Sequence, residues 1–194
     1  MTRGRPREFD ETKALEAALG VFWQKGYEGA SCEELLAAMG LNSGSMYAAF
    51  GDKQALYDKA FDLYYYTVFC KGMEILDGPG SPLKNVKAMV GCIGEHMSSP
   101  DCKGCFVSNT LMEFGAKNKG VAELARHAMK RFQDAFEQKL VAAQELGELS
   151  DSINPTEMAA FLVNMAQGLN VMAKANVGED TVRGIVRTAL AMLR

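Results

Sequence analysis

The sequence predicts an all-α protein. Apolar residues recur at intervals of three and four along most of the 194 residues, which is the spacing of one buried helix face. Short clusters of Gly, Pro, Asp and Asn separate these segments, and no segment has the apolar and polar alternation of a half-buried strand. With 48% apolar residues, the chain is apolar enough to form a core.

The first two helices lie before residue 40. The first is expected from Glu11 to Gly26, because its apolar residues fall on one face and glycine is a stop signal. The second begins after Ser31, which precedes Glu34 by the three residues of a capping box, and it ends at Gly40. The second helix is therefore only about two turns long.

A third short helix, 43–50, follows after a tight turn. Either Asn42 or Ser43 caps its start, and Gly51 with Asp52 closes it. Two short helices joined by a turn and supported by a longer one form the helix-turn-helix layout, in which the last helix enters the major groove of DNA. This layout predicts an N-terminal domain over 1–52, including the arm before the first helix.

The remainder, 53–194, is expected to form a larger helical domain that senses an effector and dimerises. Three clear breaks lie at 77–82, 98–101 and 147–155, each short enough to join packed helices. The expected helices span 53–75, 83–97, 106–116, 121–146, 155–174 and 181–193.

Residues 31–56, SCEELLAAMGLNSGSMYAAFGDKQAL, resemble the TetR family of bacterial transcriptional regulators. The likeness covers roughly residues 8 to 60, and beyond them only the helical layout and the length are similar. The resemblance implies a homodimeric repressor of double-stranded operator DNA. The matching positions are Ser31, Gly40, Gly44, Ser45, Tyr47, Phe50, Lys53 and Leu56, with Phe22 and Gly26 upstream.

The same resemblance implies the DNA contacts. Phosphates are expected to meet Ser31, Lys53 and Tyr47, and base edges or backbone to meet Ser43, Gly44 and Ser45. The position of Ser43, Gly44 and Ser45 at a helix N-terminus agrees with this expectation. Free amide groups favour a phosphate there, and small side chains allow it to approach closely. The family often has a basic residue where Ser43 stands and a histidine where Ala49 stands, so this helix lacks two side chains that anchor or read guanine.

The net charge of −3 has the wrong sign for a DNA-binding protein, because Lys and Arg usually supply most of the affinity for phosphate. The positive charge is instead concentrated at the N-terminus, in Arg3, Arg5 and Arg7. We expect this arm to insert arginine into a narrow minor groove. The alternative is a solvated tail without a role.

A small-molecule effector or a reactive thiol is expected to control the larger domain. Cys105 precedes a helix and has Lys103 nearby, an environment that lowers thiol pKa, and some similar regulators respond to oxidants or electrophiles at the corresponding cysteine. The alternatives are an inert thiol and a metal site that Cys105 forms with His96 and Cys102. No metal or cofactor is expected, because a closed structural zinc site needs four ligands and these are three. The other effector contacts expected are Tyr66, Phe106, Asn109, Glu113 and Phe132.

The last two expected helices carry wide apolar stripes, and in the family they pair with their symmetry mates as a four-helix dimer interface. Packing within one chain is the alternative. No enzyme is expected, because the chain has two histidines, no phosphate loop and no serine elbow. The rival function is a redox-active thiol protein or enzyme using Cys102 and Cys105. No membrane span or export signal is found, so we expect a cytoplasmic protein with reduced cysteines.

Overall fold

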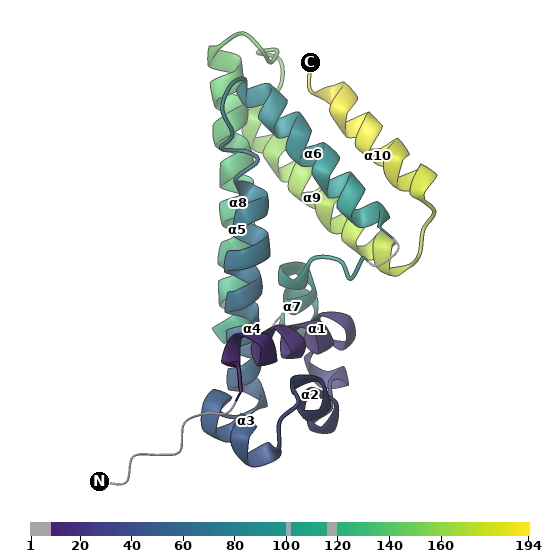
Figure 1. Cartoon of the computed structure of the whole chain (residues 1–194). Helices are drawn as coiled ribbons and strands as arrows, with labels where there is room; N and C mark the ends of the chain where they lie inside the picture. The colour runs from purple at the N-terminus through teal and green to yellow at the C-terminus, as the bar shows by residue number, and fades with distance from the viewer. Residues whose placement is uncertain (1–8, 100–101, 116–119) are drawn as a thin grey trace, which may run out of the picture. The chain divides into compact units, whose positions relative to one another are not determined.

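The computed structural model describes residues 9–99, 102–115 and 120–194, which form α-helices and one π-helical turn but no strand. The chain divides into two compact units, the first ending at Tyr65 and the second beginning at Tyr66 (Figure 1). The all-α prediction is confirmed. The sequence predicts a boundary between a DNA-binding domain and a sensing domain at 52/53. This boundary is defined by function, and it stays a prediction.

The described residues of the first unit form four helices: α1 (Glu11–Gly29), α2 (Cys32–Met39), α3 (Ser43–Phe50) and α4 (Lys53–Tyr64). Its centre is α1, which packs against both α2 and α4. The fully buried side chains of this core include Phe22, Leu35, Met46, Leu56, Tyr57 and Phe61. The helix-turn-helix segment therefore packs against a longer helix, as the sequence predicts.

Gly26 breaks α1 where the sequence predicts its end. Its φ is +76°, outside the helical range, and one further turn to Gly29 follows the break. The break sets the direction of Tyr27, whose ring centroid lies 6.3 Å from that of Phe22 and 5.4 Å from that of Tyr57. A glycine is required here because other residues are strained at this φ.

The predicted single helix over 53–75 is interrupted. After α4 the chain forms a π-helical turn, Tyr65–Phe69, and then a short helix α5 (Cys70–Met73). The turn begins within a run of three tyrosines, 64–66, and also contains the β-branched Thr67 and Val68. Such side chains lose rotamer freedom against the preceding turn of an α-helix, which weakens the regular pattern at this point.

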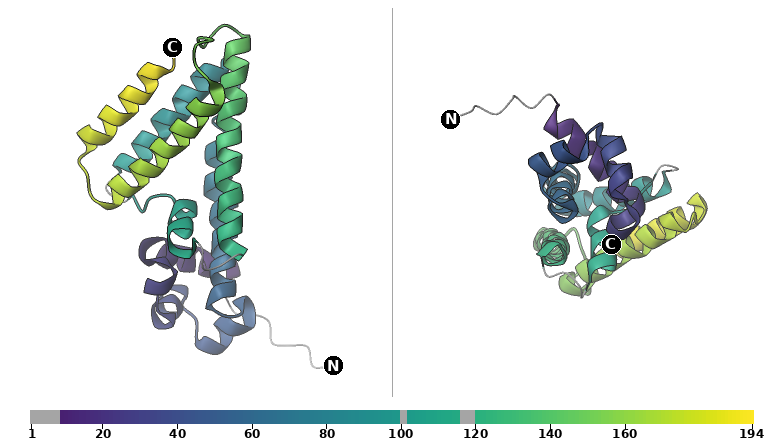
Figure 2. Two further views of the ribbon diagram at one scale, coloured as in Figure 1. Left: turned by 180° about the vertical axis from the view of Figure 1, so that it is seen from behind. Right: turned by 90° about the horizontal axis from the view of Figure 1, so that it is seen from below.

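The rest of the second unit consists of α6 (Pro82–Ser98), α7 (Phe106–Phe114), α8 (Gly120–Glu145), α9 (Pro155–Lys174) and α10 (Glu179–Met192). Helix α8 packs against α6, α7 and α9, while α6, α9 and α10 run side by side (Figures 1 and 2). The core between them includes Leu76, Val86, Val90, Phe136, Leu140, Leu162, Leu169 and Val182. The predicted end of α7 at residue 116 lies outside the described residues.

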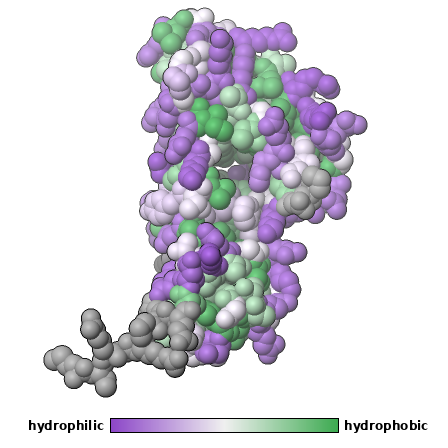
Figure 3. Space-filling view, viewed as in Figure 1, coloured by the Kyte–Doolittle hydropathy of each residue, from purple (hydrophilic) through white to green (hydrophobic). Residues whose placement is uncertain are grey.

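The surface mixes hydrophilic side chains with apolar patches, as Figure 3 shows for one face. All five cysteines are free, and their reduced state stays a prediction. Among the described residues, the helices are too short or too polar for any of them to cross a membrane.

Candidate nucleic-acid interface and sensing cysteine

The start of α2 is fixed by a reciprocal pair of hydrogen bonds. Ser31 Oγ accepts from the amide of Glu34 at 3.1 Å, and the Glu34 carboxylate accepts from the amide of Ser31 at 3.1 Å. This is the predicted capping box, which satisfies two amides that the first helical turn leaves without partners. Ser31 is exposed, so its position leaves it open to a bound phosphate.

The turn between α2 and α3 depends on Gly40 and Asn42. Gly40 adopts the left-handed conformation with φ +65°, and the amide of Leu41 bonds back to Leu36 O at 3.0 Å. Asn42 then caps α3, because its side-chain oxygen accepts from the amide of Ser45 at 2.9 Å. Of the two predicted caps, Asn42 is therefore the one used.

One face of α3 is anchored and the other is exposed. Met46 and Phe50 are 1% and 3% exposed, whereas Tyr47 is 52% exposed. Ser43 and Gly44 are exposed at the N-terminus of the helix, and Ser45 is half-buried. The helix therefore presents small polar residues and a tyrosine to a partner, as a groove-reading helix must.

Lys53, the first residue of α4, has its ammonium over the ring of Tyr27, with Nζ 4.5 Å from the ring centroid. A second lysine, Lys59, donates to Ala49 O at 3.2 Å and lies over the ring of Phe50. Lys59 thus places a positive charge at the C-terminal end of α3, where the helix dipole favours it.

Acidic side chains outnumber basic ones in this unit, and one of the four lysines of residues 9–65 is paired with a carboxylate. Lys25 forms an ion pair with Glu34. Its ammonium, together with the Ser31 hydrogen bonds, holds the pKa of Glu34 below its usual range. The three arginines predicted to enter the minor groove, Arg3, Arg5 and Arg7, lie outside the described residues.

Cys105, which is predicted to be a sensing thiol, stands at the N-cap of α7, and no side chain caps the helix there. The amide of Cys105 donates to Asn170 Oδ1 on α9 at 2.6 Å. Asn170 is 1% exposed and also donates to Asn109 Oδ1 at 3.4 Å. Asn109 completes the chain of bonds by donating to Lys103 O at 3.3 Å.

Asn170 and Ser108 are the residues that sequence reasoning missed. Asn170 interrupts the apolar face of α9, and that single polar residue was the available signal. Ser108 is 3% exposed, and its hydroxyl has no hydrogen-bond partner among the described residues. A buried hydroxyl without a partner costs about 1–3 kcal/mol, so it is a position at which a bound molecule could contribute a bond.

The six residues predicted to meet an effector have different surroundings. Cys105 and Asn109 share Asn170 as a partner, whereas Phe132 packs against Phe69 and Phe136, and Tyr66 is 67% exposed. The remaining two are Phe106, which is buried, and Glu113, which is half-buried.

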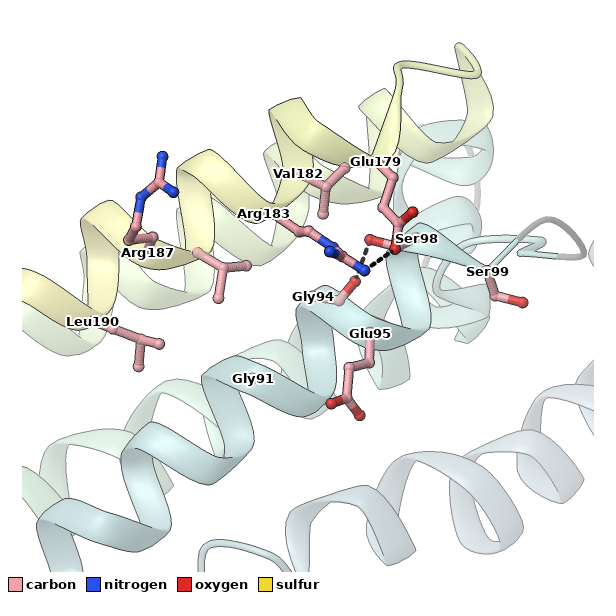
Figure 4. A pocket seen from close by; sticks show the side chains of 11 residues that line it. Gly91, Gly94, Glu95, Ser98, Ser99, Glu179, Val182, Arg183, Arg187 and Leu190 are labelled. Carbon is pink, nitrogen blue, oxygen red and sulfur yellow. Dashed lines mark hydrogen bonds and ion pairs between the residues drawn. The ribbon is translucent and has the colours of Figure 1, made fainter.

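Two surface grooves of the second unit lie elsewhere. One, of about 600 Å³, runs between α6 and α10 (Figure 4), with Arg183 turned toward Glu179 at 2.6 Å. The other follows α8 and is lined mainly by charged residues. Neither groove is lined by any of the six predicted residues. Within the described residues, no three His, Cys, Asp or Glu side chains are placed to hold a metal ion.

Most of the apolar residues that form the predicted stripes of α9 and α10 pack within the chain. Met158, Leu162, Met165 and Leu169 are buried in the core of the second unit. A second face of α9 remains exposed and carries no charged residue between Glu157 and Lys174. Its exposed members are Ala160, Phe161, Asn164, Gly168 and Val171, which we call the α9 outer face.

Two family models match the chain. One, described as bacterial regulatory proteins of the tetR family, matches residues 14–60. The other, described as a tetracyclin repressor-like C-terminal domain, matches residues 82–189, more than half of the chain.

Similar proteins match over nearly the full length. An uncharacterised HTH-type transcriptional regulator, YezE of Bacillus subtilis, is 28% identical over 98% of this chain and 99% of its own. The HTH-type transcriptional repressor ComR of Escherichia coli is 29% identical over 98% of this chain and 92% of its own. A structure of the regulator CifR, a cysteine mutant complexed with 26bp double-strand operator DNA, is 29% identical, covers 96% of this chain and 98% of its own, and has a TM-score of 0.86.

Proposed function

The chain belongs to the TetR family of bacterial regulatory proteins, and from this premise we propose that it represses transcription by binding operator DNA as a homodimer. The observation that carries the proposal is the exposed face of α3. This face is anchored by Met46 and Phe50 and presents Ser43, Gly44 and Tyr47. The CifR complex with operator DNA and the repressor ComR support the same function.

In the proposed complex α3 enters the major groove. Ser43, Gly44 and Ser45 approach the bases or the backbone, and Gly44 allows the closest approach because it has no side chain. Phosphate contacts come from Ser31, Tyr47 and Lys53, at the start of α2, on α3 and at the start of α4. The arm with Arg3, Arg5 and Arg7 adds contacts in the minor groove. The proposal keeps the division into a DNA-binding domain over 1–52 and a sensing domain over 53–194, with Lys53 adding a phosphate contact from the first residue of the sensing domain.

DNA binding is tested by fluorescence anisotropy with a labelled duplex taken from upstream of the protein's own gene. We expect wild-type protein to bind this duplex more tightly than a random duplex. Gly44→Glu should abolish the preference, because it places a carboxylate against the DNA. The matched control is Gly178→Glu, at an exposed glycine of the second unit with no atom within 4 Å of the added Cβ. Binding of neither duplex at low salt would contradict the function.

We assign the dimer contact to α9 and α10, with the α9 outer face at its centre. A face of small and apolar residues without charge suits a self-complementary interface between two copies. Val171→Arg, at a side chain that is 54% exposed, should give a monomer in sedimentation velocity. Val141→Arg, at an exposed valine of α8, is the control and should remain a dimer. A wild-type monomer at micromolar concentration would contradict the assignment.

Release from DNA is assigned to chemistry at Cys105. Hypochlorite converts a thiol to a sulfenic acid and a quinone adds to it, and either product places new atoms beside the 2.6 Å bond from the Cys105 amide to Asn170. We expect both reagents to release wild-type protein from the duplex. Cys105→Ser should stay bound, whereas Cys92→Ser, which removes an exposed thiol of α6, should behave as wild type. Identical release of all three proteins would exclude this mechanism.

A small-molecule effector is the second mechanism of release, and the buried hydroxyl of Ser108 favours it. The effector would meet Phe106, Asn109 and Glu113 on α7, with Tyr66 and Phe132 as the further contacts predicted. The rival function, a redox-active thiol protein or enzyme using Cys102 and Cys105, requires no DNA binding, so the duplex experiment separates it from the regulator.

A further inference from the structure

Lys53 is held by the ring of an aromatic residue. Its Nζ lies 4.5 Å from the centroid of the Tyr27 ring. That distance is within the range of a cation–π contact, in which the negative face of the ring attracts an ammonium group. Tyr27 lies four residues before Ser31, which is another of the proposed phosphate-binding residues.

The Tyr27 ring is itself fixed on two sides. It is stacked against Phe22, with centroids 6.3 Å apart, and meets the edge of Tyr57 at 5.4 Å and 90°. Phe22 and Tyr57 are each 0% exposed. The ring is therefore part of the packed core of the first unit and forms a rigid platform beneath the Lys53 ammonium.

Lys53 stands where the helix dipole does not favour its charge. It is the first residue of α4, and the positive end of the helix dipole repels a cation at that position. Within the described residues, no carboxylate forms an ion pair with it. A free lysine side chain loses rotamer entropy when a phosphate immobilises it, and a side chain that is already ordered loses less.

The charge around the ring also favours the pair. Burial raises the pKa of Tyr27, and the carboxylates of Glu28, Asp52 and Asp58 raise it further. The phenol is therefore neutral at physiological pH, and its surroundings carry a negative potential that attracts the ammonium. The same carboxylates repel a DNA phosphate, so a lysine held at this point offsets them.

We propose that Tyr27 is a positioning residue for DNA binding, which orders the Lys53 ammonium for a backbone phosphate while making no DNA contact of its own. This inference rests on the proposed function, since it requires that Lys53 binds a phosphate. It assigns to Tyr27 a role beyond the packing of α1 against α4.

The test is a double-mutant cycle in anisotropy titrations, with the same labelled upstream duplex. Tyr27→Leu should weaken binding about two- to fivefold for each subunit, which is the strength of one exposed cation–π contact. Tyr27→Phe keeps the ring and should bind as wild type. In the Lys53→Gln background Tyr27→Leu should cause no further loss, because the group that it positions is absent. Lys13→Gln, at an exposed lysine of α1, is the control for charge and should have little effect.

The outcomes separate this inference from the function. In one outcome wild type binds the duplex, Lys53→Gln weakens binding, and Tyr27→Leu has the same effect with and without Lys53→Gln. This outcome would support DNA binding but overturn the positioning role of Tyr27. Absence of binding by wild type would overturn both.

A second measurement remains informative if Tyr27→Leu does not fold. In the DNA-free protein, NMR should find the ε-methylene protons of Lys53 shifted upfield by the ring, relative to those of Lys13. Lys53 resonances at the ordinary lysine position would overturn the inference. Tyr27→Phe should retain the upfield shift.

Discussion

At the scale of single residues, Gly104 shows how closely the sensing segment is fitted to α9. Its φ is +75°, a conformation that favours glycine, and a Cβ at this position would lie 2.0 Å from Asn170 Oδ1. The same oxygen accepts the hydrogen bond from the Cys105 amide. Asn170 Oδ1, which accepts the bond from Cys105, therefore also leaves no room for a side chain at residue 104.

Gly104→Ala should consequently destabilise the protein in two ways. The left-handed conformation alone costs a residue with a Cβ about 1–2 kcal/mol, and displacement of Asn170 adds the loss of a buried hydrogen bond, about 1–3 kcal/mol. Gly147→Ala is the matched control, because its φ is +69° and nothing lies within 4 Å of its Cβ. Urea unfolding followed by circular dichroism measures both variants. Equal losses would mean that Asn170 moves aside freely.

At the scale of secondary-structure elements, the position of α3 depends on Asn42. Its side-chain oxygen accepts from the Ser45 amide at 2.9 Å, and the helix it caps is only eight residues long. A helix this short is not stable by itself, so its cap and its two anchors, Met46 and Phe50, determine whether it forms.

Two substitutions of Asn42 should separate stability from DNA binding. Asn42→Ala removes the cap and should cost about 1 kcal/mol in urea unfolding. Asn42→Asp keeps a capping oxygen and should unfold as wild type does, but its charge next to Ser43 should weaken duplex binding in anisotropy titrations. If Asn42→Asp binds DNA as tightly as wild type, the N-terminus of α3 does not face the phosphates.

At a second element, α6, the start of the helix is held by hydrogen bonds to an acidic residue that is distant in the sequence. The Glu148 carboxylate accepts from Ser81 Oγ at 2.7 Å and from the Leu83 amide at 3.1 Å. These bonds hold the pKa of Glu148 below its usual range. Because the pKa is lower in the folded state, the stabilisation is present at neutral pH and is lost as the pH falls through the folded-state value.

Glu148→Gln should therefore lower the urea midpoint at pH 7 more than at pH 3. The amide keeps one acceptor but loses the charge, and at low pH the wild-type carboxyl is protonated as well. Glu157→Gln, at an exposed residue in the first turn of α9, controls for a general effect of charge. A difference between wild type and Glu148→Gln that is independent of pH would show that the carboxylate charge contributes nothing.

The helices could be predicted from the sequence because their signals are local. Asn154 and Pro155 mark the start of α9 within two residues, and the capping box from Ser31 to Glu34 spans four residues. The contact between Asn170 and Cys105 joins residues 65 apart, so no local pattern indicates it. The exposed α3 face was predictable for the same local reason, whereas the effector residues depend on how distant helices meet, which no local pattern indicates.

At the scale of the whole molecule, charge decides how the protein can bind DNA. The net charge is −3, and one of the four lysines of residues 9–65, Lys25, is engaged in an ion pair within the unit. The proposed contacts therefore combine few cations with uncharged donors, namely Ser31, Ser43 and Tyr47. Uncharged donors strengthen binding without displacing counterions from a phosphate, so they do not make it sensitive to salt.

The dependence of DNA affinity on salt should accordingly be modest and mostly due to the arm. Each neutralised phosphate contributes about −0.9 to the slope of log K against log salt, so Lys53 with Arg3, Arg5 and Arg7 gives at most about −7 for a dimer. Deletion of residues 1–7 should reduce the slope to about −2, and adding Lys53→Gln should bring it close to zero. Anisotropy titrations over a salt series measure these slopes. An unchanged slope after the deletion would exclude the arm from the contacts, and a wild-type slope steeper than about −7 would mean that cations of other segments bind the phosphates.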